Sequence, residues 1–298
     1  MDSFTYSLGL IGYPVGHSLS PFIHNAALRA LGLAGDYRLF TIPPLPDGLA
    51  PLEKLLDMLR RGELHGLNVT IPHKQSVFPL VDELTPAAQS IGAVNTLYPR
   101  KGSLVGDNTD ALGFGADLER VLGPQPGIWP SDDGSNDWAL ILGAGGSARA
   151  VVFALIQAGW KVNIAARRLE QAEKLASSLK GLAPSGTLSA SRLDGLGHTI
   201  ARNWFSLVVN TTPLGMVPNV TANPWPSGLP FPRGAFVYDL VYNPPQTSLV
   251  KAAVASGLRA SNGLGMLVEQ AALAFELWTG QSAPRNVMRS AALSHQEG

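Results

Sequence analysis

The chain has 298 residues, no cysteine, and 22 basic against 22 acidic side chains, so its formal net charge is zero. The missing cysteines exclude disulfides, thiolate zinc sites and cysteine nucleophiles, and the lack of a long basic run argues against a nucleic-acid partner. The length favours two domains over one, and the balanced charge favours a small molecule as the partner.

The N-terminal segment contains neither the basic region nor the long apolar core of a targeting signal. No segment approaches the roughly 20 apolar residues that a membrane span needs. We therefore expect a soluble, cytoplasmic protein without a membrane partner.

Short apolar runs alternate with stretches of helical periodicity, a pattern typical of βα units and a mostly parallel sheet. The predicted strands are 6–11, 66–71, 138–142, 161–165, 207–210 and 235–240, and the predicted helices are 21–31, 49–60, 146–157 and 169–179. The fold class expected from this order is α/β.

The segment GHSLSPFIHN, residues 16–25, contains two serines with different expected roles. Ser20 immediately precedes Pro21, and serine at the N-cap with proline at the first helical position predicts a helix start. A helix N-terminus also attracts anions, so Ser20 could cap and bind a carboxylate at one location. We expect no capping role for Ser18.

Three stretches interrupt the alternation. Residues 123–137 are rich in Gly, Pro, Ser and Asp and predict a mobile connection at a domain boundary. Residues 218–234 carry five prolines and exclude a regular helix or central strand. Residues 181–200 have weak periodicity and predict a loop with one short element.

A glycine-rich turn follows the predicted strand WALIL. Gly143, Gly145 and Ala148 match the pattern G-x-G-x-x-G/A inside a strand-turn-helix-strand unit, which favours dinucleotide binding at the helix N-terminus over a purely structural turn. The next strand ends in Arg167 and Arg168, where an NAD site usually has an acid. Two guanidinium groups suit a 2′-phosphate, so the sequence favours NADP, although a solvated strand end is the alternative.

The C-terminal helical segment carries one polar residue on its apolar face. That face comprises residues 266, 267, 270, 271, 274, 275 and 278, and Gln270 is its only polar member. A buried amide needs hydrogen-bond partners, so Gln270 takes part either in a core network or in binding a ligand hydroxyl.

Three histidines, His17, His24 and His73, lie near polar motifs of the first third of the chain. Their spacing matches no recognised set of metal ligands, and no carboxylate accompanies them at a spacing typical of a metal site. We therefore assign them structural or positional roles and predict no metal.

Several motifs together resemble the shikimate dehydrogenase family. They are GYPVGHSLSPFIHN, NVTIPHK, GAVNT, GDNTDALG, GAGGSARA, NTTPLGM, YDLVYNPPQT and GLGMLVEQAALAF, and they span almost the whole chain. The resemblance implies two α/β lobes with a cleft between them. The domains would be a substrate-binding domain over 1–110, a Rossmann-type NADP domain over 111–262, and C-terminal helices over 263–298 that return to the substrate domain.

The resemblance also implies an activity and a set of site residues. The activity is reversible hydride transfer between NADP and C3 of shikimate, forming 3-dehydroshikimate, in aromatic amino-acid and chorismate biosynthesis. The implied substrate-binding residues are Ser18, Ser20, Thr70, Asn95, Tyr242 and Gln270. The implied cofactor-binding residues are Gly143, Ala144, Gly145, Gly146, Ser147, Ala166, Arg167, Arg168, Leu240 and Gly263.

The family chemistry requires a group that moves the proton of the C3 hydroxyl. Lys74 and Asp110 suit this role, because a lysine can act as acid or base and a neighbouring carboxylate can orient it. Which of the two carries the proton stays open. We expect a monomer or homodimer.

Three alternatives differ from this interpretation. A quinate/shikimate dehydrogenase that uses NAD is disfavoured by Arg167 and by serine at both 18 and 20. A non-catalytic sensor is disfavoured because Lys74 and Asp110 are both present. A folate-linked dehydrogenase with a similar plan would not explain the Ser-Leu-Ser and Asn-Thr-Asp segments.

The residues Ala166, Arg167 and Arg168 depart from the Asn-Arg-Thr common in the family.

Overall fold

The computed structural model describes residues 4–123, 129–130 and 138–296. By compactness the chain divides into two units, a first unit of Met1–Gly113 with Leu267–Gly298 and a second unit of Phe114–Met266. These divisions fall inside helices, a few residues beyond the predicted domain limits at 110 and 262. Residues 124–128 and 131–137, most of the predicted mobile connection, lie outside the described residues, and the division does not fall at that segment.

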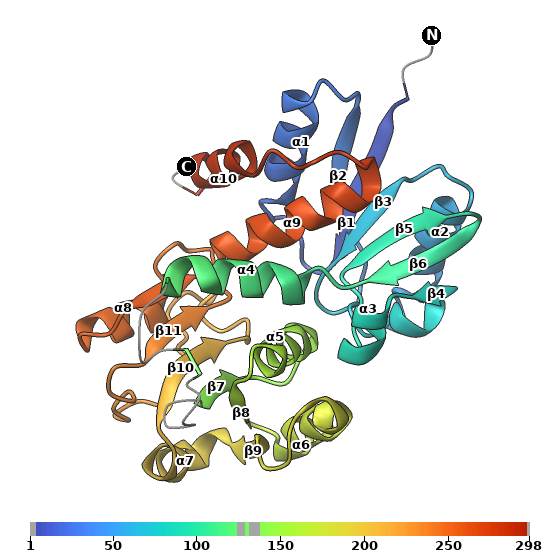
Figure 1. The fold of residues 1–298 in the computed structure, drawn as a ribbon. Helices are drawn as coiled ribbons and strands as arrows, with labels where there is room; N and C mark the ends of the chain where they lie inside the picture. Colours follow the sequence, from blue (N-terminus) through green and yellow to red (C-terminus); the bar gives the residue numbers. More distant parts are fainter. Residues whose placement is uncertain (1–3, 124–128, 131–137, 297–298) are drawn as a thin grey trace. The chain divides into compact units, whose positions relative to one another are not determined.

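The first unit contains a mixed six-stranded sheet in the order β2-β1-β3-β5-β6-β4 (Figure 1). Its elements are β1 Tyr6–Gly12, α1 Ser20–Ala30, β2 Gly35–Thr41, α2 Leu49–Arg60, β3 Gly66–Val69, η1 Phe78–Leu80, β4 Glu83–Leu84, α3 Pro86–Ile91, β5 Thr96–Arg100, β6 Ser103–Asp107, the start of α4 Asp110–Leu122, most of α9 Leu264–Thr279, and α10 Arg285–Ser294. Strands β1, β2 and β3 are parallel, whereas β5 is antiparallel to both of its neighbours.

The second unit contains a fully parallel six-stranded sheet. Its elements are β7 Trp138–Leu142, α5 Gly146–Gln157, β8 Lys161–Ala166, α6 Leu169–Leu179, η2 Lys180–Leu182, β9 Leu188–Arg192, η3 Leu193–Gly195, α7 Leu196–Arg202, β10 Phe205–Asn210, β11 Phe236–Asp239, α8 Ser248–Ala255 and β12 Ala260–Asn262. The spatial order β9-β8-β7-β10-β11-β12 is that of a doubly wound dinucleotide-binding sheet, which confirms the Rossmann-type prediction.

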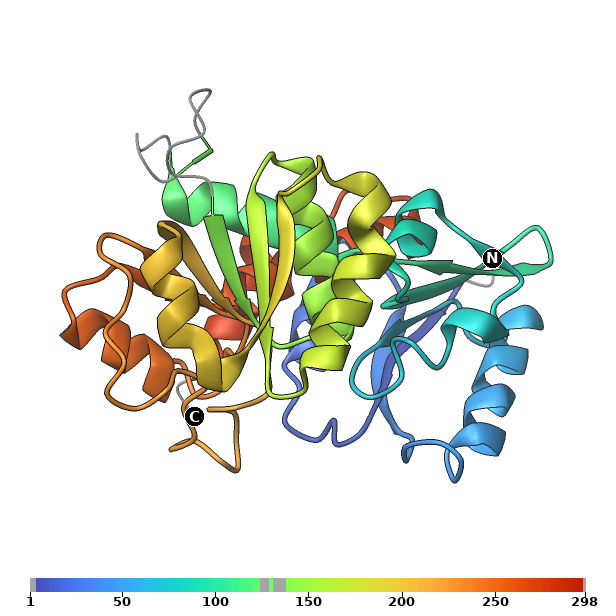
Figure 2. The same cartoon turned by 90° about the horizontal axis from the view of Figure 1, so that it is seen from below.

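Alternating side chains of β7 supply two hydrophobic cores, one on each face of the second sheet. Ala139 and Ile141 pack with residues of α5 and α6, whereas Leu140 and Leu142 pack with residues of α7 and α8. Figure 2 shows helices on both faces of this sheet. Because both faces are covered, the central strand β7, WALIL, is a continuous apolar run rather than an alternating one, as expected for a parallel sheet.

Most predicted elements are confirmed, and the differences have local causes. The helices at 49–60, 146–157 and 169–179 and the strand at 138–142 agree to the residue. Strand β3 ends at Val69, two residues early, because the chain leaves the ladder before Pro72. The prediction of a single short element over 181–200 is wrong, because β9, η3 and the start of α7 all lie there. Residues 218–234 contain neither helix nor strand, as predicted.

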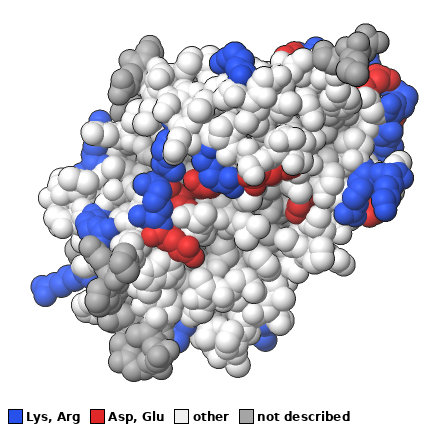
Figure 3. All heavy atoms as spheres, turned by 45° about the horizontal axis from the view of Figure 1, so that its top comes forward, with Lys and Arg blue, Asp and Glu red and all other residues white. Residues whose placement is uncertain are grey.

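Among the described residues, no helix has both the length and the apolar character needed to cross a membrane. On the face drawn in Figure 3, acidic and basic side chains lie in mixed groups and most of the surface is uncharged. This agrees with the low charged fraction of the chain, 15%.

Candidate functional site

A buried ion pair between Lys74 and Asp110 forms the centre of the candidate site in the first unit. The Lys74 Nζ lies 2.6 Å from Asp110 Oδ2, and the two side chains are only 11% and 6% exposed. Removing two charges from water is costly, so such a pair persists only when further hydrogen bonds satisfy its remaining atoms. The neighbours of Asp110 provide them.

Asn95 and Gln270 complete the group around Asp110. Asn95 Nδ2 donates to Asp110 Oδ1 at 2.8 Å and to Gln270 Oε1 at 3.4 Å. Gln270 Nε2 donates to the carbonyl of Leu267 at 2.8 Å. The structure therefore brings together four predicted site residues, and the amide of Gln270 has both a local partner and a partner in the site.

Backbone hydrogen bonds hold the three segments that carry these side chains. Val94 N–H donates to the carbonyl of Lys74 at 2.8 Å, and Asn95 N–H donates to the carbonyl of Asp107 at 3.0 Å. The loop after β3, the loop before β5 and the loop after β6 are therefore joined directly. This explains how residues distant in sequence meet.

Asp110 occupies the first turn of α4, where a helix dipole stabilises a negative charge. The side chain of Asn108 accepts from the N–H groups of Asp110 and Ala111 at 3.1 and 3.4 Å, so Asn108 caps the helix. The carboxylate of Asp110 therefore does not cap the helix and can bond to Lys74.

Helices α4 and α9 approach each other closely at Gln270. A Cβ atom on Gly113 would lie 2.7 Å from the backbone nitrogen of Gln270, a distance that real Cβ atoms do not reach. Glycine at 113 therefore permits the helix contact that carries Gln270 to Asn95.

The predicted substrate-binding residues Ser18, Ser20 and Thr70 lie at the carboxyl edge of the first sheet. Strands β1 and β3 are parallel neighbours that end at Gly12 and Val69, and the loops that follow are joined by a 2.9 Å bond from Tyr13 N–H to the carbonyl of Ile71. Both loops leave the sheet at the same edge, which agrees with a common site.

The expectation for the two serines is wrong in detail. Helix α1 begins at Ser20 with Leu19 as its cap residue, and no side chain caps it. The Ser18 hydroxyl accepts from the Ser20 N–H at 3.2 Å and donates to the Ser20 hydroxyl at 3.2 Å. Because the helix starts one residue early, Ser18 rather than Ser20 satisfies a free N–H group.

The glycine-rich turn of the second unit connects β7 to α5. Gly143 has a φ of +112°, and a Cβ there would lie 2.7 Å from Thr211 Oγ1, so both conformation and space require glycine. Gly145 is the cap residue of α5, and a Cβ there would meet nothing within 4 Å. Ala144, Gly146 and Ser147 belong to the same turn and are partly exposed.

This turn lies between β7 and β10, where the strand order reverses, which is the usual position of a dinucleotide in an open parallel sheet. Helix α5 directs its first N–H groups and its positive dipole end toward the open space beside Gly145. The residues of the turn therefore fit a pyrophosphate.

Ala166, Arg167 and Arg168 follow at the end of β8. Ala166 is buried, whereas both arginines are exposed. In the described part of the chain neither arginine has an ion-pair partner, unlike Arg60, Arg100, Arg192 and Arg285, which pair with carboxylates. Two cations without a protein partner suit the additional phosphate of NADP.

Leu240 and Gly263 lie against each other beyond β11. A Cβ on Gly263 would collide with the carbonyl oxygen of Leu240. The buried carboxyl of Asp239 holds this region by accepting from Asn210 Nδ2 at 2.8 Å, from Val241 N–H at 3.0 Å and from the Thr247 hydroxyl at 2.6 Å. Tyr242 follows in the same loop of the second unit and is half-buried.

Of the three histidines, His17 is exposed, whereas the other two lie in the interior of the first unit. His24 and His73 are buried, and His73 Nε2 lies 2.8 Å from the carbonyl of Ile42. Within the described ranges, no group of three or more His, Asp or Glu side chains could hold a metal ion.

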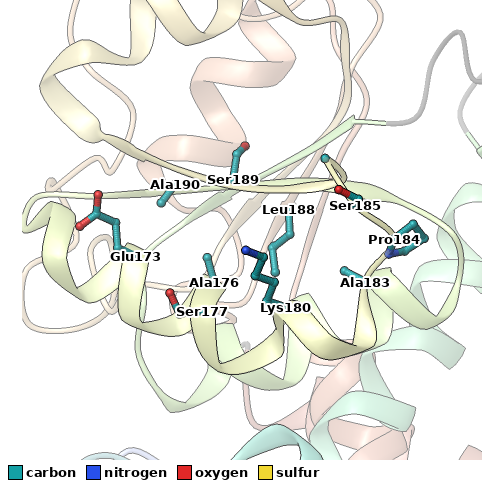
Figure 4. A pocket seen from close by; sticks show the side chains of 11 residues that line it. Glu173, Ala176, Ser177, Lys180, Ala183, Pro184, Ser185, Leu188, Ser189 and Ala190 are labelled. Carbon is teal, nitrogen blue, oxygen red and sulfur yellow. The ribbon is translucent and has the colours of Figure 1, made fainter.

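A separate pocket of about 420 Å³ lies between α6 and β9 (Figure 4). Glu173 and Lys180 are its charged lining residues, and none of the predicted site residues lines it. We therefore do not assign the candidate site to this pocket.

Sequence reasoning did not identify Asn68, Thr96, Asn108 or Thr109, all of which are buried. The signal available was weak: two Asn-Thr pairs, at 95–96 and 108–109, of which the first follows small apolar residues and the second lies in a polar turn. Small polar residues of this kind usually serve turns, so their burial was needed to recognise them.

Comparisons with known proteins agree with this geometry. Residues 10–97 match the family model described as shikimate dehydrogenase substrate binding domain, and residues 263–293 match that described as shikimate 5'-dehydrogenase C-terminal domain. The chain is 43% identical over 302 residues to shikimate dehydrogenase (NADP(+)) of Methanopyrus kandleri, an alignment that covers 99% of this chain and 97% of its relative.

Two solved structures extend the comparison. Shikimate 5-dehydrogenase from Thermus thermophilus, in complex with NADP(H) and shikimate, has a TM-score of 0.80 and 37% identity, covering 97% of this chain and 99% of that one. Quinate dehydrogenase from Corynebacterium glutamicum, in complex with NAD, has a TM-score of 0.84 and 33% identity, covering 97% and 99%. The identity and coverage establish that this chain belongs to the shikimate dehydrogenase family.

Proposed function

We propose that this protein catalyses the reversible, NADP-dependent oxidation of shikimate to 3-dehydroshikimate, with Lys74 and Asp110 handling the proton of the reacting hydroxyl. The observation that carries the proposal is the buried ion pair, 2.6 Å from Lys74 Nζ to Asp110 Oδ2, in a chain of this family. In the direction of reduction the reaction serves aromatic amino-acid and chorismate biosynthesis.

The oxidation of a secondary alcohol releases a hydride from carbon and a proton from oxygen. NADP, when bound, supplies the acceptor for the hydride. The proton passes to the Lys74 and Asp110 pair, because these are the acid-base groups at the centre of the site, and it returns to the carbonyl oxygen in the reverse direction. Asp110 orients the Lys74 amine, while Asn95 holds the other carboxylate oxygen.

The remaining polar residues of the first unit position the substrate. Ser18 and Ser20, at the start of α1, bind its carboxylate, which the dipole of the helix also favours. Thr70, Asn95 and Gln270 surround the ring hydroxyls. Tyr242 is a further substrate-binding residue by the family resemblance.

The second unit holds the cofactor. The turn from Gly143 to Ser147 binds the pyrophosphate. The adenosine 2′-phosphate end is bound by Ala166, Arg167 and Arg168. The nicotinamide lies near Leu240 and Gly263. Support for NADP comes from the exposed arginines after β8 and from the NADP(+)-dependent relatives. Cytoplasmic location and a monomeric or homodimeric state stay predictions.

The competing function is oxidation of quinate with NAD, which the similarity to the Corynebacterium glutamicum structure makes worth measuring. Initial rates should be measured for the purified protein with shikimate and NADP and with quinate and NAD. We expect kcat/KM for shikimate with NADP to be higher by about 100-fold or more, because an acid that would bind the ribose of NAD is missing after β8. Comparable values for the two pairs would overturn the assignment.

A further inference from the structure

A chain of buried hydrogen bonds leads to the Lys74 and Asp110 pair, and its first three members have no role in the activity described above. It begins at Tyr37 on β2, continues through Asn68 on β3 and Thr96 on β5, and reaches Asn95. Tyr37, Asn68, Thr96 and Asn95 are exposed by 4% or less. Their polar atoms are therefore closed to solvent and must satisfy one another.

The orientation of the Asn95 amide is determined by two partners of fixed polarity. The Thr109 backbone N–H, which can only donate, lies 2.7 Å from Asn95 Oδ1. Oxygen Oδ1 of Asp110, which as a carboxylate can only accept, lies 2.8 Å from Asn95 Nδ2. Turning the amide over would place donor against donor and acceptor against acceptor.

The orientation of Asn68 follows in the same way. Its Nδ2 lies 3.3 Å from the backbone carbonyl of Asn95, which can only accept, and 3.4 Å from Thr96 Oγ1. Its Oδ1 therefore faces the Tyr37 hydroxyl, which donates to it at 2.8 Å.

Thr96 connects the two amides. Its hydroxyl accepts from Asn68 Nδ2, so its own proton is available to Asn95 Oδ1 at 3.0 Å, with the Thr109 hydroxyl 3.1 Å away. In the chain of hydrogen bonds Tyr37, Asn68, Thr96, Asn95, each side chain then donates to the next, and Asn95 donates to the carboxylate of Asp110. Aligned hydrogen bonds polarise one another, and their strength is greatest where water is excluded.

We propose that Thr96 is a positioning residue, whose buried hydroxyl transmits this donor chain to Asn95 and so holds the Asn95 amide group against Asp110. The proposal rests on the proposed function, because it concerns the same Lys74 and Asp110 pair. Thr96 acts on this pair through Asn95. Loss of the chain therefore weakens the hold on the carboxylate that orients the Lys74 amine.

The test compares Thr96→Val, which keeps the shape and removes the hydroxyl, with Thr96→Ser, which keeps the hydroxyl. We expect Thr96→Val to lower kcat about tenfold, while KM for shikimate changes less than about twofold. Thr96→Ser should restore kcat to within about twofold of the parent protein.

Tyr37→Phe provides a second variant, because it removes the first donor and leaves the ring that stacks on His24 at 4.3 Å. We expect a smaller fall in kcat, about two- to threefold, again with little change in KM for shikimate. Thr279→Val is the matched control, since that hydroxyl donates to the carbonyl of Phe275 within α9 and lies outside the donor chain.

The outcomes separate the two proposals. If the parent protein does not oxidise shikimate with NADP, the proposed function fails. If the parent protein is active and Thr96→Val and Tyr37→Phe keep its kcat, the positioning role is wrong and the function stands. If Thr96→Val does not fold, an unchanged kcat in Tyr37→Phe still contradicts the donor chain.

Discussion

The two parts of the candidate site differ in how their polar groups are satisfied. In the first unit, the Lys74 amine and the Asp110 carboxylate are buried and bonded to each other, and Asp110 also accepts from Asn95. In the second unit, Arg167 and Arg168 are exposed, and the space beside Gly145 is open. The groups assigned to proton transfer have protein partners, whereas the groups assigned to cofactor binding depend on the ligand for theirs.

This difference has a physical reason. A proton-transfer group must already be oriented when the substrate binds, since misplacement by a fraction of an ångström costs rate. A phosphate-binding group is solvated until the ligand replaces its water molecules. Its exposure in the free protein therefore has little energetic cost. Substitutions at the ion pair of the first unit should therefore change turnover, and those at the exposed groups of the second unit should change cofactor affinity.

The largest effect is expected for Lys74→Met. Without the amine, the Lys74 and Asp110 pair that takes up the proton of the substrate hydroxyl is broken, so kcat should fall by about 100-fold or more, with a much smaller change in KM for shikimate. Lys54→Met, on the exposed side of α2, is the control and should retain full activity. Near-normal turnover of folded Lys74→Met would remove the residue from the chemistry.

The next effect concerns Arg167→Ala combined with Arg168→Ala. Loss of two charge-assisted contacts should raise KM for NADP by about 10- to 100-fold and leave kcat and the weak activity with NAD nearly unchanged. Arg29→Ala, an exposed change in α1, should alter neither. An equal loss with NADP and NAD would show that the arginines do not contact the 2′-phosphate.

The comparison extends to stability, because each unit buries a titratable group with a shifted pKa. In the first unit, burial lowers the pKa of His24 to about 3, although a hydrogen bond with the Asn68 side chain acts in the opposite direction. Unfolding therefore takes up a proton below the ordinary pKa of 6.5, so stability present above pH 6.5 is lost as the pH falls.

His24→Phe should remove this loss. Between pH 7 and pH 5, the parent protein should lose about 2 kcal/mol more unfolding free energy than the variant does, as measured by urea titration. Equal losses would mean that the ring of His24 is not held neutral in the folded protein.

Asp239 in the second unit should act in the opposite direction. Burial raises the pKa of its carboxyl to about 6, although Thr247, Val241 and Asn210 donate to it. Its stabilising contribution is therefore complete below pH 3.8 and is lost as the pH rises through about 6. Lowering the pH from 7 to 5 should stabilise the parent protein by about 1 kcal/mol relative to Asp239→Asn. A difference of the opposite sign in the urea titration would contradict the buried neutral form.

The smallest effect is expected for Ser18→Ala. KM for shikimate should rise by about threefold to tenfold, because one hydrogen bond to the carboxylate is lost. A loss of about 0.5 kcal/mol in stability should accompany it, since the hydroxyl also accepts from the Ser20 N–H. Ser294→Ala, at the end of α10, is the control. A stability loss of several kcal/mol with unchanged KM would make Ser18 purely structural.

Local patterns predicted the elements well, but they could not predict the hydrogen-bond partners. Helix 146–157 agrees to the residue because the glycine turn marks its start and Gly159 follows its end. The pairing of Lys74 with Asp110 was expected only from the family resemblance. Thr96 was missed because its partners, Asn68 and Thr109, are distant in sequence and meet only through the order of the sheet.

The prediction for Ser18 and Ser20 was wrong for a related reason. A serine before proline is a sound helix-start signal, but a shift of one residue in the helix boundary exchanged the roles of the two hydroxyls. Sequence patterns locate such a boundary only to within a residue or two, whereas a capping bond depends on a single residue.

The most direct test of the division between the two units is a calorimetric titration of Lys74→Met with NADP. The variant should bind NADP with the same dissociation constant as the parent protein, within about twofold, although it turns over shikimate about 100-fold more slowly. A loss of NADP affinity parallel to the loss of turnover would contradict the assignment of proton transfer to Lys74 and Asp110 and of cofactor binding to the second unit.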